Sequence, residues 1–451
     1  MSQTTVDWDQ AGAEAVARLR AMIRFDTTNP PGQETALAQH LAGELRAGGI
    51  EAQVLESTPG RGNLVARLPG SGSGRPVLLL SHLDVVPAEA QLWSRPPFAG
   101  ELEDGYVWGR GAIDSKLTGA LHVQLALMCR RAGLPLQRDL VVVAAADEEF
   151  GGHRGVEWLV AEHPEWFEAE YALNEAGGFA VPVAGRPLYT CQVAEKGSAP
   201  VDLICRGRPG HSSVPHGDNA LFPLGAALVR LADASPPHRV TPTVQAFFRG
   251  AAAAQTSDTV AHDLLAALEP AGHRQALARL PVEPAVRHML DAMLRNTWAP
   301  TVVQGGIKRN VIPASARVQL SGRPLPGVDQ DTFMRELRDA LGTEAELVAE
   351  PFRPGLEFDH GSALFEHATA ALQQFEPGAP LVPYMQTGGT DARFLGAHDM
   401  TVYGFVPMRY EPGLDFFELC HGHDERVSVA NVRFGVQVLH ALVCRLNGLA
   451  D

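Results

Sequence analysis

The sequence predicts an α/β protein, in which a mainly parallel sheet carries helices on both faces and a smaller, ferredoxin-like α+β domain is inserted. Two observations lead to this prediction. Short apolar segments alternate with amphipathic helical segments in the first and last parts of the chain, whereas the middle part has strands of alternating polarity. The chain has 451 residues, 45% of them hydrophobic and 20% charged, which suits two globular domains.

Two helices open the chain. Residues 9–25 are amphipathic and rich in Ala and Arg, and the Pro-Pro-Gly sequence at 30–32 prevents this helix from continuing. The next helix carries leucines on one face, at positions 37, 41 and 45, and ends at the glycine pair 48–49.

Apolar strands and helices then alternate. We expect strands at 52–55, 64–68, 77–80, 140–146, 171–173 and 401–405, and helices at 116–131, 156–162 and 427–447. Strands that are apolar throughout are typical of a parallel sheet covered on both faces.

The middle of the chain follows another pattern from Glu195 onward. We expect strands at 201–205, 301–304, 316–320 and 344–349, and helices at 219–232 and 330–341. A long helical insertion, about residues 236–298, interrupts this order, which is otherwise β-α-β-β-α-β. We therefore place the larger domain at 1–196 and 354–451 and the inserted domain at 197–353.

Composition excludes several classes of function. The net charge of −15 argues against a nucleic-acid or anionic-membrane partner. The apolar stretches are shorter than the roughly 20 residues that span a bilayer, and the first residues lack the features of a signal peptide. The five cysteines form no CxxC pair, so neither a disulfide framework nor a thiolate zinc site is indicated. We expect a cytoplasmic protein.

Polar side chains follow two of the apolar strands directly. His82 comes after the strand at 77–80, and Glu148 and Glu149 come after the strand at 140–146. Ligands bind at the carboxyl ends of parallel strands in open α/β sheets. A histidine and carboxylates that converge there suit a divalent metal ion that activates water.

The neighbouring residues suggest separate roles. Asp84 lies two residues after His82 and is placed to accept the second ring N–H of that histidine. Asp114 follows a glycine-rich segment and is our candidate bridge between two metal ions roughly 3.5–4 Å apart. Because Glu148 and Glu149 are adjacent, their side chains diverge, and we expect one to bind metal and the other to move a proton. Further candidate ligands are Glu175 and His421.

These residues together resemble a known family. The motifs are Thr28-Asn29-Pro30-Pro31-Gly32, His82-x-Asp84, Asp114, Glu148-Glu149, Glu175, Gly210-His211, Asn310-Val311-Ile312-Pro313, Gly388-Gly389-Thr390-Asp391 and His421-x-x-Asp424-Glu425. They resemble the aminoacylase/carboxypeptidase G/succinyl-diaminopimelate desuccinylase family of zinc peptidases. The long insertion resembles the larger aminoacylase and vacuolar-carboxypeptidase-like branch of that family.

The resemblance implies a site with two Zn²⁺ ions, although Co²⁺ or Mn²⁺ also suits such nitrogen and oxygen ligands. One metal would be bound by His82, Asp114 and Glu175, and the other by Asp114, Glu149 and His421. Glu148 would be the general base, and Asp84 would support His82.

The resemblance also implies that the inserted domain is a lid through which two chains form a homodimer. His211 on the lid would stabilise the oxyanion, often in the active site of the partner subunit. Arg323 would bind a substrate carboxylate, and Asn310 with the backbone of Gly388 and Gly389 would position the substrate. The family usually has Asp where this chain has Ser321.

We therefore expect a metal-dependent hydrolase that cleaves the amide bond of small molecules, either N-acyl amino acids or short peptides with a free carboxylate. A dipeptidase or carboxypeptidase is the near alternative. A non-catalytic zinc-binding scaffold is the alternative from another class. A dinucleotide-dependent enzyme is weaker, because Gly109-x-Gly111 lacks the third glycine and the strand-then-helix setting of that fingerprint.

Overall fold

The structure is a computed structural model that describes residues 6–342, 345–414 and 416–449. The chain forms two compact units. The first comprises Met1–Val193, Phe358–Tyr384 and Thr390–Asp451, and the second comprises Ala194–Glu357 and Met385–Gly389. The boundaries that we expected lie within a few residues of these. The segment 385–389 is the difference, since the sequence pattern placed it in the larger domain.

One large sheet dominates the first unit. Its strands are, in spatial order, β1 (Glu51–Glu56), β2 (Gly62–Leu68), β6 (Leu140–Ala145), β3 (Val77–His82), β7 (Tyr171–Asn174), β18 (Thr401–Gly404), β9 (Arg186–Glu195) and β16 (Leu356–Glu357); β8 (Ala180–Val183) and β17 (Leu381–Gln386) also pair with β9. The four strands from β6 to β18 are parallel to one another, and both flanks are antiparallel.

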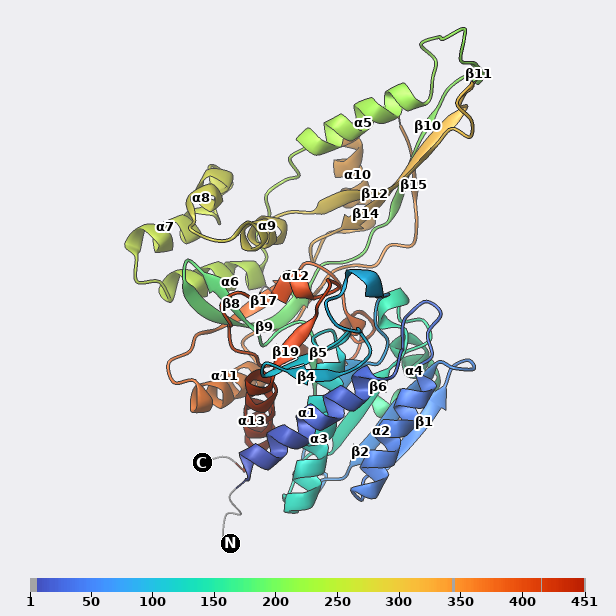
Figure 1. Cartoon of the computed structure of the whole chain (residues 1–451). Coiled ribbons are helices and arrows are strands. Elements are labelled where there is room, and N and C mark those ends of the chain that lie inside the picture. The colour runs from blue at the N-terminus through green and yellow to red at the C-terminus, as the bar shows by residue number, and fades with distance from the viewer. Residues whose placement is uncertain (1–5, 343–344, 415, 450–451) are drawn as a thin grey trace. The chain divides into compact units, whose positions relative to one another are not determined.

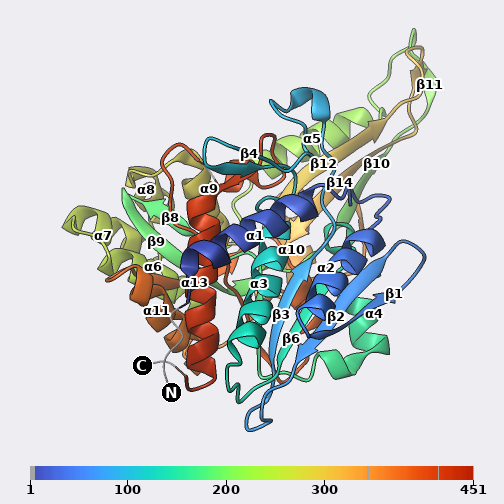
Figure 2. The ribbon, with the colours of Figure 1, turned by 60° about the horizontal axis from the view of Figure 1, so that its bottom comes forward.

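Helices cover both faces of this sheet, because its central strands are apolar throughout. Figure 2 shows α2 (Thr35–Ala47) and α3 (Lys116–Ala132) in front of strands β1, β2, β3 and β6, and α1 (Trp8–Ile23) packs on α3. On the other face, α4 (Val156–Glu162) packs on β3 and β6 through a cluster that includes Val156, Leu159, Leu80 and Val143. The predicted fold class is confirmed.

The last helix, α13 (Val429–Leu446), packs against α1, α3 and α11 (Ala363–Phe375). It is long and apolar enough to cross a membrane by length and composition, but 67% of it is buried in the protein. That pattern is typical of a core helix.

A smaller three-stranded sheet and short helices complete the first unit. The sheet contains β19 (Arg426–Ser428), β5 (Tyr106–Trp108) and β4 (Glu101–Glu103), and the short helices are α12 (Phe416–Leu419) and the 3₁₀ turns η1 (Ala90–Leu92), η2 (Glu148–Phe150), η3 (Pro164–Trp166) and η4 (Asp391–Phe394).

The second unit contains a four-stranded antiparallel sheet. Its spatial order is β12 (Thr297–Gly305), β14 (Ser315–Arg323), β10 (Val201–Arg206) and β15 (Glu346–Ala349). Two helices, α5 (Leu221–Asp233) and α10 (Gln330–Leu341), pack together beside it (Figure 1). The order along the chain is β-α-β-β-α-β, as predicted. Residue 344 of the last predicted strand lies outside the described residues. A short pair, β11 (Gly210–His211) with β13 (Val311–Ile312), lies at the tip of this unit.

The insertion between α5 and β12 is helical, as the sequence predicted. It consists of α6 (Pro242–Ala253), α7 (Asp258–Ala266), α8 (His273–Arg279) and α9 (Pro284–Met293). Thr241 begins α6, because its hydroxyl accepts the Val244 N–H and Pro242 occupies the first turn. The insertion buries its own apolar side chains, Phe247, Phe248 and Leu290 among them.

Candidate metal centre

Three predicted ligands meet at the carboxyl edge of the parallel strands. His82 is the last residue of β3, Glu175 directly follows β7, and Asp114 lies shortly before α3. The Nε2 atom of His82 lies 3.0 Å from Asp114 Oδ1 and 3.0 Å from Glu175 Oε2. Because β3 and β7 pair in parallel, His82 and Glu175 come together at the same edge of the sheet.

A second group of ligands shares Asp114 with the first. His421 Nε2 lies 3.2 Å from Asp114 Oδ2 and 3.2 Å from Glu149 Oε2. Within each group of three the ligand atoms lie within 4.8 Å of one another. Asp114 therefore turns one oxygen toward each group, which is the arrangement of a carboxylate that bridges two metal ions.

The residues fit a pair of divalent metal ions. Imidazole nitrogen and carboxylate oxygen are ligands that suit Zn²⁺, Mn²⁺ and Co²⁺. The Oε1 atom of Glu149 is buried and has no hydrogen-bond partner among the described residues, so a ligand would satisfy it.

Burial and the charges of the neighbouring ligands shift the pKa values of the histidines and of Glu149 in this site. Hydrogen bonds to Asp114 and Glu149 raise the pKa of His421 to about 10. Burial opposes a rise at His82, yet Glu175 and Asp114 hold its pKa well above the usual value. Burial and the nearby charge of Asp114 raise the pKa of Glu149 to about 7. At His421 a bound metal ion would therefore displace a proton.

Comparisons with known proteins agree with this geometry. The model of the peptidase family M20/M25/M40 matches residues 78–445, a span that contains every ligand of both groups. The chain belongs to this family. The resemblance predicted from the motifs is therefore confirmed, and the chain is an enzyme of the metal-dependent M20 hydrolases.

Similar M20 proteins have several names. The "N-fatty-acyl-amino acid synthase/hydrolase PM20D1" of Xenopus tropicalis is 29% identical over 382 residues, which cover 82% of this chain and 72% of that protein. Aminoacylase-1 of Sus scrofa is 26% identical over 448 residues, 96% of this chain and 95% of that one. The crystal structure of human carnosine dipeptidase 1 matches with a TM-score of 0.71 at 16% identity over 98% of both chains, which shows the shared fold.

Asp84 has a second role in this M20 chain besides the support of His82 that the spacing predicted. The Nδ1 atom of His82 lies 2.9 Å from the backbone oxygen of Asp84, whereas the nearer carboxylate oxygen is 3.6 Å away. The carboxylate also accepts the backbone N–H groups of Glu148 and Glu149, each at 3.1 Å. Asp84 thus contacts His82 through both its main chain and its carboxylate, and its carboxylate also fixes the Glu148–Glu149 turn.

The side chains of Glu148 and Glu149 diverge, as their adjacency predicted. Both lie in the 3₁₀ turn η2, which Asp147 enters with a φ of 74°. Glu149 faces His421, while Glu148 Oε1 accepts a hydrogen bond from Arg393 at 2.9 Å. Burial raises the pKa of Glu148 well above its usual value, and the charge of Arg393 opposes that rise. Glu148 therefore stays outside both ligand groups.

Arg393 is a site residue that sequence reasoning missed. Besides the Glu148 carboxylate, its guanidinium donates to the backbone oxygen of Glu148 at 3.2 Å and lies 3.5 Å from Asp391 Oδ1. The only available signal was its position two residues after the Thr390-Asp391 motif.

Two further buried groups support the ligands. Glu425 accepts the backbone N–H groups of Ile113 (2.7 Å) and Asp114 (3.0 Å), which fixes the bridging aspartate. Arg61 pairs with Asp147 and with Glu34, each at 2.8 Å. Glu425 belonged to a quoted motif without a role, whereas nothing in the sequence pointed to Arg61.

The remaining predicted site residues belong to the second unit. His211 is exposed in β11, where its Nδ1 accepts the Ser213 hydroxyl at 2.7 Å. The backbone oxygen of Asn310 accepts the Ser212 N–H at 3.2 Å, so His211 and Asn310 lie close together. Arg323 is half-buried as the last residue of β14, in the four-stranded sheet of this unit. Gly388 and Gly389 lie in the segment that joins this unit.

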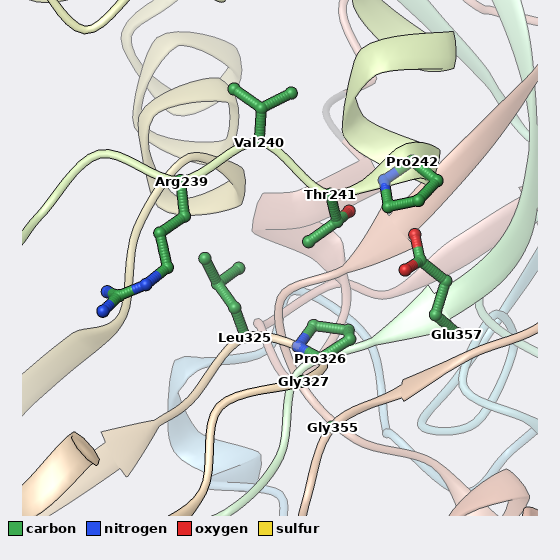
Figure 3. A pocket seen from close by; sticks show the side chains of 9 residues that line it. All are labelled: Arg239, Val240, Thr241, Pro242, Leu325, Pro326, Gly327, Gly355 and Glu357. Atoms are coloured by element: carbon green, nitrogen blue, oxygen red, sulfur yellow. The ribbon is translucent and has the colours of Figure 1, made fainter.

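The second unit also has a cavity of about 630 Å³ (Figure 3). It is lined by Arg239, Val240, Thr241, Pro242, Leu325, Pro326, Gly327, Gly355 and Glu357. None of the predicted site residues lines it.

Proposed function

We propose that this protein hydrolyses the amide bond of N-acyl amino acids, or of short peptides with a free carboxylate, by means of two metal ions. One observation carries the proposal: Asp114 presents its two oxygens to two separate ligand groups, while Glu148 lies beside them and binds to neither. The names of the aminoacylase and N-fatty-acyl-amino-acid relatives support this substrate class.

The metals that we propose are Zn²⁺, and a bound Zn²⁺ lowers the pKa of its water from 15.7 to about 7. Glu148 takes a proton from the attacking water as the new C–O bond forms. It then returns that proton to the leaving nitrogen as the C–N bond breaks. Arg393 and the backbone held by Asp84 orient the Glu148 carboxylate for both transfers.

The second unit supplies substrate contacts in this proposal. His211 donates a hydrogen bond to the developing oxyanion, and Ser213 fixes the orientation of its ring. Arg323 binds the substrate carboxylate through its planar guanidinium. Asn310, Gly388 and Gly389 position the substrate backbone.

We also propose that two chains pair through β12. This strand is at the edge of its sheet, and Val303 is 60% exposed there. On the neighbouring helix α5, Phe222 and Val229 are 63% and 62% exposed. An open apolar edge strand is a ready surface for pairing with a second copy. We further propose a cytoplasmic location, in keeping with five cysteines that are all free thiols.

The test is hydrolysis by the metal-loaded protein of a panel that contains acetyl and long-chain N-acyl amino acids and dipeptides, with and without chelator. We expect release of free amino acid from the N-acyl substrates, and its loss with chelator. Release from dipeptides alone would instead establish a dipeptidase or carboxypeptidase. Metal binding without hydrolysis of any substrate would contradict the proposal, and absence of metal would favour a scaffold.

A further inference from the structure

Lys196 is a buried lysine at the start of the second unit. Only 1% of it is exposed, and its ammonium donates to the backbone oxygens of Ala292 (3.1 Å) and Arg295 (2.9 Å) and to the hydroxyl of Thr297 (2.9 Å). Ala292 and Arg295 belong to the last turn of α9 and the residues after it, where a cation is favourable. Lys196 therefore binds the end of the helical insertion through these hydrogen bonds.

The partners of Lys196 lead directly to Arg323. Thr297 lies opposite Arg323 in the β12–β14 pair. The residues on either side of Arg323 are bonded to the segment that follows Lys196, because Pro324 O accepts the Gly197 N–H at 2.8 Å and Gly322 O accepts the Ala199 N–H at 2.9 Å. The backbone around Arg323 is thus fixed by its pairing with Thr297 and by the two hydrogen bonds to its neighbours in sequence.

The backbones of Gly322 and Ala199 lie very close together. A Cβ atom on Gly322 would lie 2.2 Å from the oxygen of Ala199, so only glycine fits there. The positive charges of Arg295 and Arg323 also reach Lys196, since they add to burial in lowering its pKa to about 7.

Asn296 holds the chain just beyond Arg323. It is fully buried, its Oδ1 accepts the Leu325 N–H at 2.8 Å, and its Nδ2 donates to Glu336 Oε2 at 2.8 Å. The other carboxylate oxygen of Glu336 is paired with Arg239. Asn296 therefore connects the Arg323 segment both to α10 and to the start of the insertion.

The first helix of the insertion is bound by a carboxylate, whereas the last helix is bound by the Lys196 ammonium. Glu357 accepts the Thr243 N–H at 2.7 Å, in the first turn of α6, where a negative charge is favourable. Figure 3 shows the Glu357 carboxylate beside Pro242, with Leu325 on the far side of the cavity. Glu357 and Leu325 both line this cavity.

We infer that Lys196 and Asn296 are positioning residues for Arg323. The insertion is then required for carboxylate recognition, because the backbone oxygens at the end of its last helix accept the hydrogen bonds of the Lys196 ammonium. This inference rests on the proposed function, in which Arg323 binds the substrate carboxylate.

The test compares one N-acyl amino acid that the metal-loaded enzyme hydrolyses with its carboxamide analogue. Arg323→Ala is the reference, and Lys196→Met and Asn296→Ala are the test variants. We expect each test variant to raise KM for the carboxylate substrate about tenfold or more, with kcat little changed and no effect on the carboxamide. In the double variant, Lys196→Met adds nothing to the KM effect of Arg323→Ala.

The control is Glu346→Gln, a variant of an exposed carboxylate on β15 in the same unit, for which we expect no change. Equal losses on both substrates, or additive effects in the double variant, would overturn the positioning role. If Arg323→Ala itself shows no preference for the carboxamide, the proposed role of Arg323 fails and the inference falls with it.

A second measurement does not depend on activity. Hydrogen exchange should become faster at the amides of Gly197, Ala199 and Leu325 in Lys196→Met or Asn296→Ala, and should stay unchanged between β10 and β15. If Lys196→Met does not fold, Asn296→Asp serves instead, because it keeps the acceptor for Leu325 and loses the donor to Glu336. Unchanged exchange at all three amides would overturn the inference.

Discussion

The roles of the two adjacent glutamates can be separated by a single change. Glu148→Gln removes the group that moves the proton but no metal ligand. We expect kcat to fall about 10²–10⁴-fold, the usual contribution of a general base, with both metals retained. Metal analysis and steady-state kinetics check this, with the exposed Glu162→Gln as control. Near-normal turnover in Glu148→Gln would show that another group is the base.

Arg393 should affect activity through Glu148. Its charge opposes the rise in the pKa of that carboxyl group, so Arg393→Met should raise the pKa further. The base must be ionised to accept a proton, and the pH of half-maximal kcat on the acidic side should therefore move upward. Arg393→Lys should restore part of both kcat and the profile. A lower kcat with an unchanged pH profile would leave Arg393 without this role.

Metal binding should release protons. The pKa of His421 is raised to about 10 in the metal-free protein, so this group is protonated at neutral pH and a metal ion must displace that proton. Apparent metal affinity should therefore fall as the pH is lowered from about 10. The release can be measured by adding Zn²⁺ to the metal-free protein in a weak buffer and recording the colour change of a pH indicator. His421→Asn should release less, and equal release would contradict the pKa shift.

Residue types and spacing pointed to His82, Glu149 and Glu175 as candidate ligands, because these residues follow strands whose ends are recognisable in the sequence. The full ligand set, with Asp114 and His421, came from the family resemblance. Residue types and spacing were insufficient for Arg393 and Arg61, whose partners Glu148 and Asp147 are distant in sequence. Charged pairs of this kind depend on the three-dimensional fold. Likewise, the sequence left the support of Arg323 open at Ser321. In the structure Lys196 bonds to Thr297, which lies opposite Arg323, and Asn296 bonds to Leu325, two residues beyond it.

At the level of elements, the turn η2 depends on a strand end that is not its neighbour in sequence. The Asp84 carboxylate, just after β3, accepts two N–H groups of η2. Asp84→Asn replaces one acceptor with a donor that faces those groups. We expect metal affinity to fall about 10–100-fold, as for other residues that support metal ligands. Competition with a chelator measures it, and unchanged affinity would mean that η2 keeps its shape without Asp84.

The apolar strands and the helical insertion were predictable as elements because their patterns are local. The long strand β9 was not expected, although eight of its ten residues are buried. It pairs with β8, β16, β17 and β18, and these partners come from widely separated parts of the chain. Such a strand is specified by its neighbours in the sheet rather than by a pattern of its own.

For the whole molecule, the change of pattern near Glu195 was enough to predict two units. It did not predict that residues 385–389 belong to the second unit, because that assignment depends on contacts such as the Lys196 N–H to Gln386 O bond at 3.0 Å. Gly388 and Gly389 lie in this short segment. The predicted substrate contacts, from His211 to these glycines, therefore all belong to the unit that carries the exposed strand β12.

Pairing of two chains through β12 gives the proposal for His211 a decisive test. If His211 acts in the active site of the partner subunit, a dimer of His211→Ala and Glu148→Gln chains contains one site with both residues intact. Two inactive variants should then regain activity when they are unfolded and refolded together, but not when each is refolded alone. Val303→Lys, which places charges on the pairing edge, should abolish both the dimer and this recovery. Dimers without recovery would instead assign His211 to the site of its own chain.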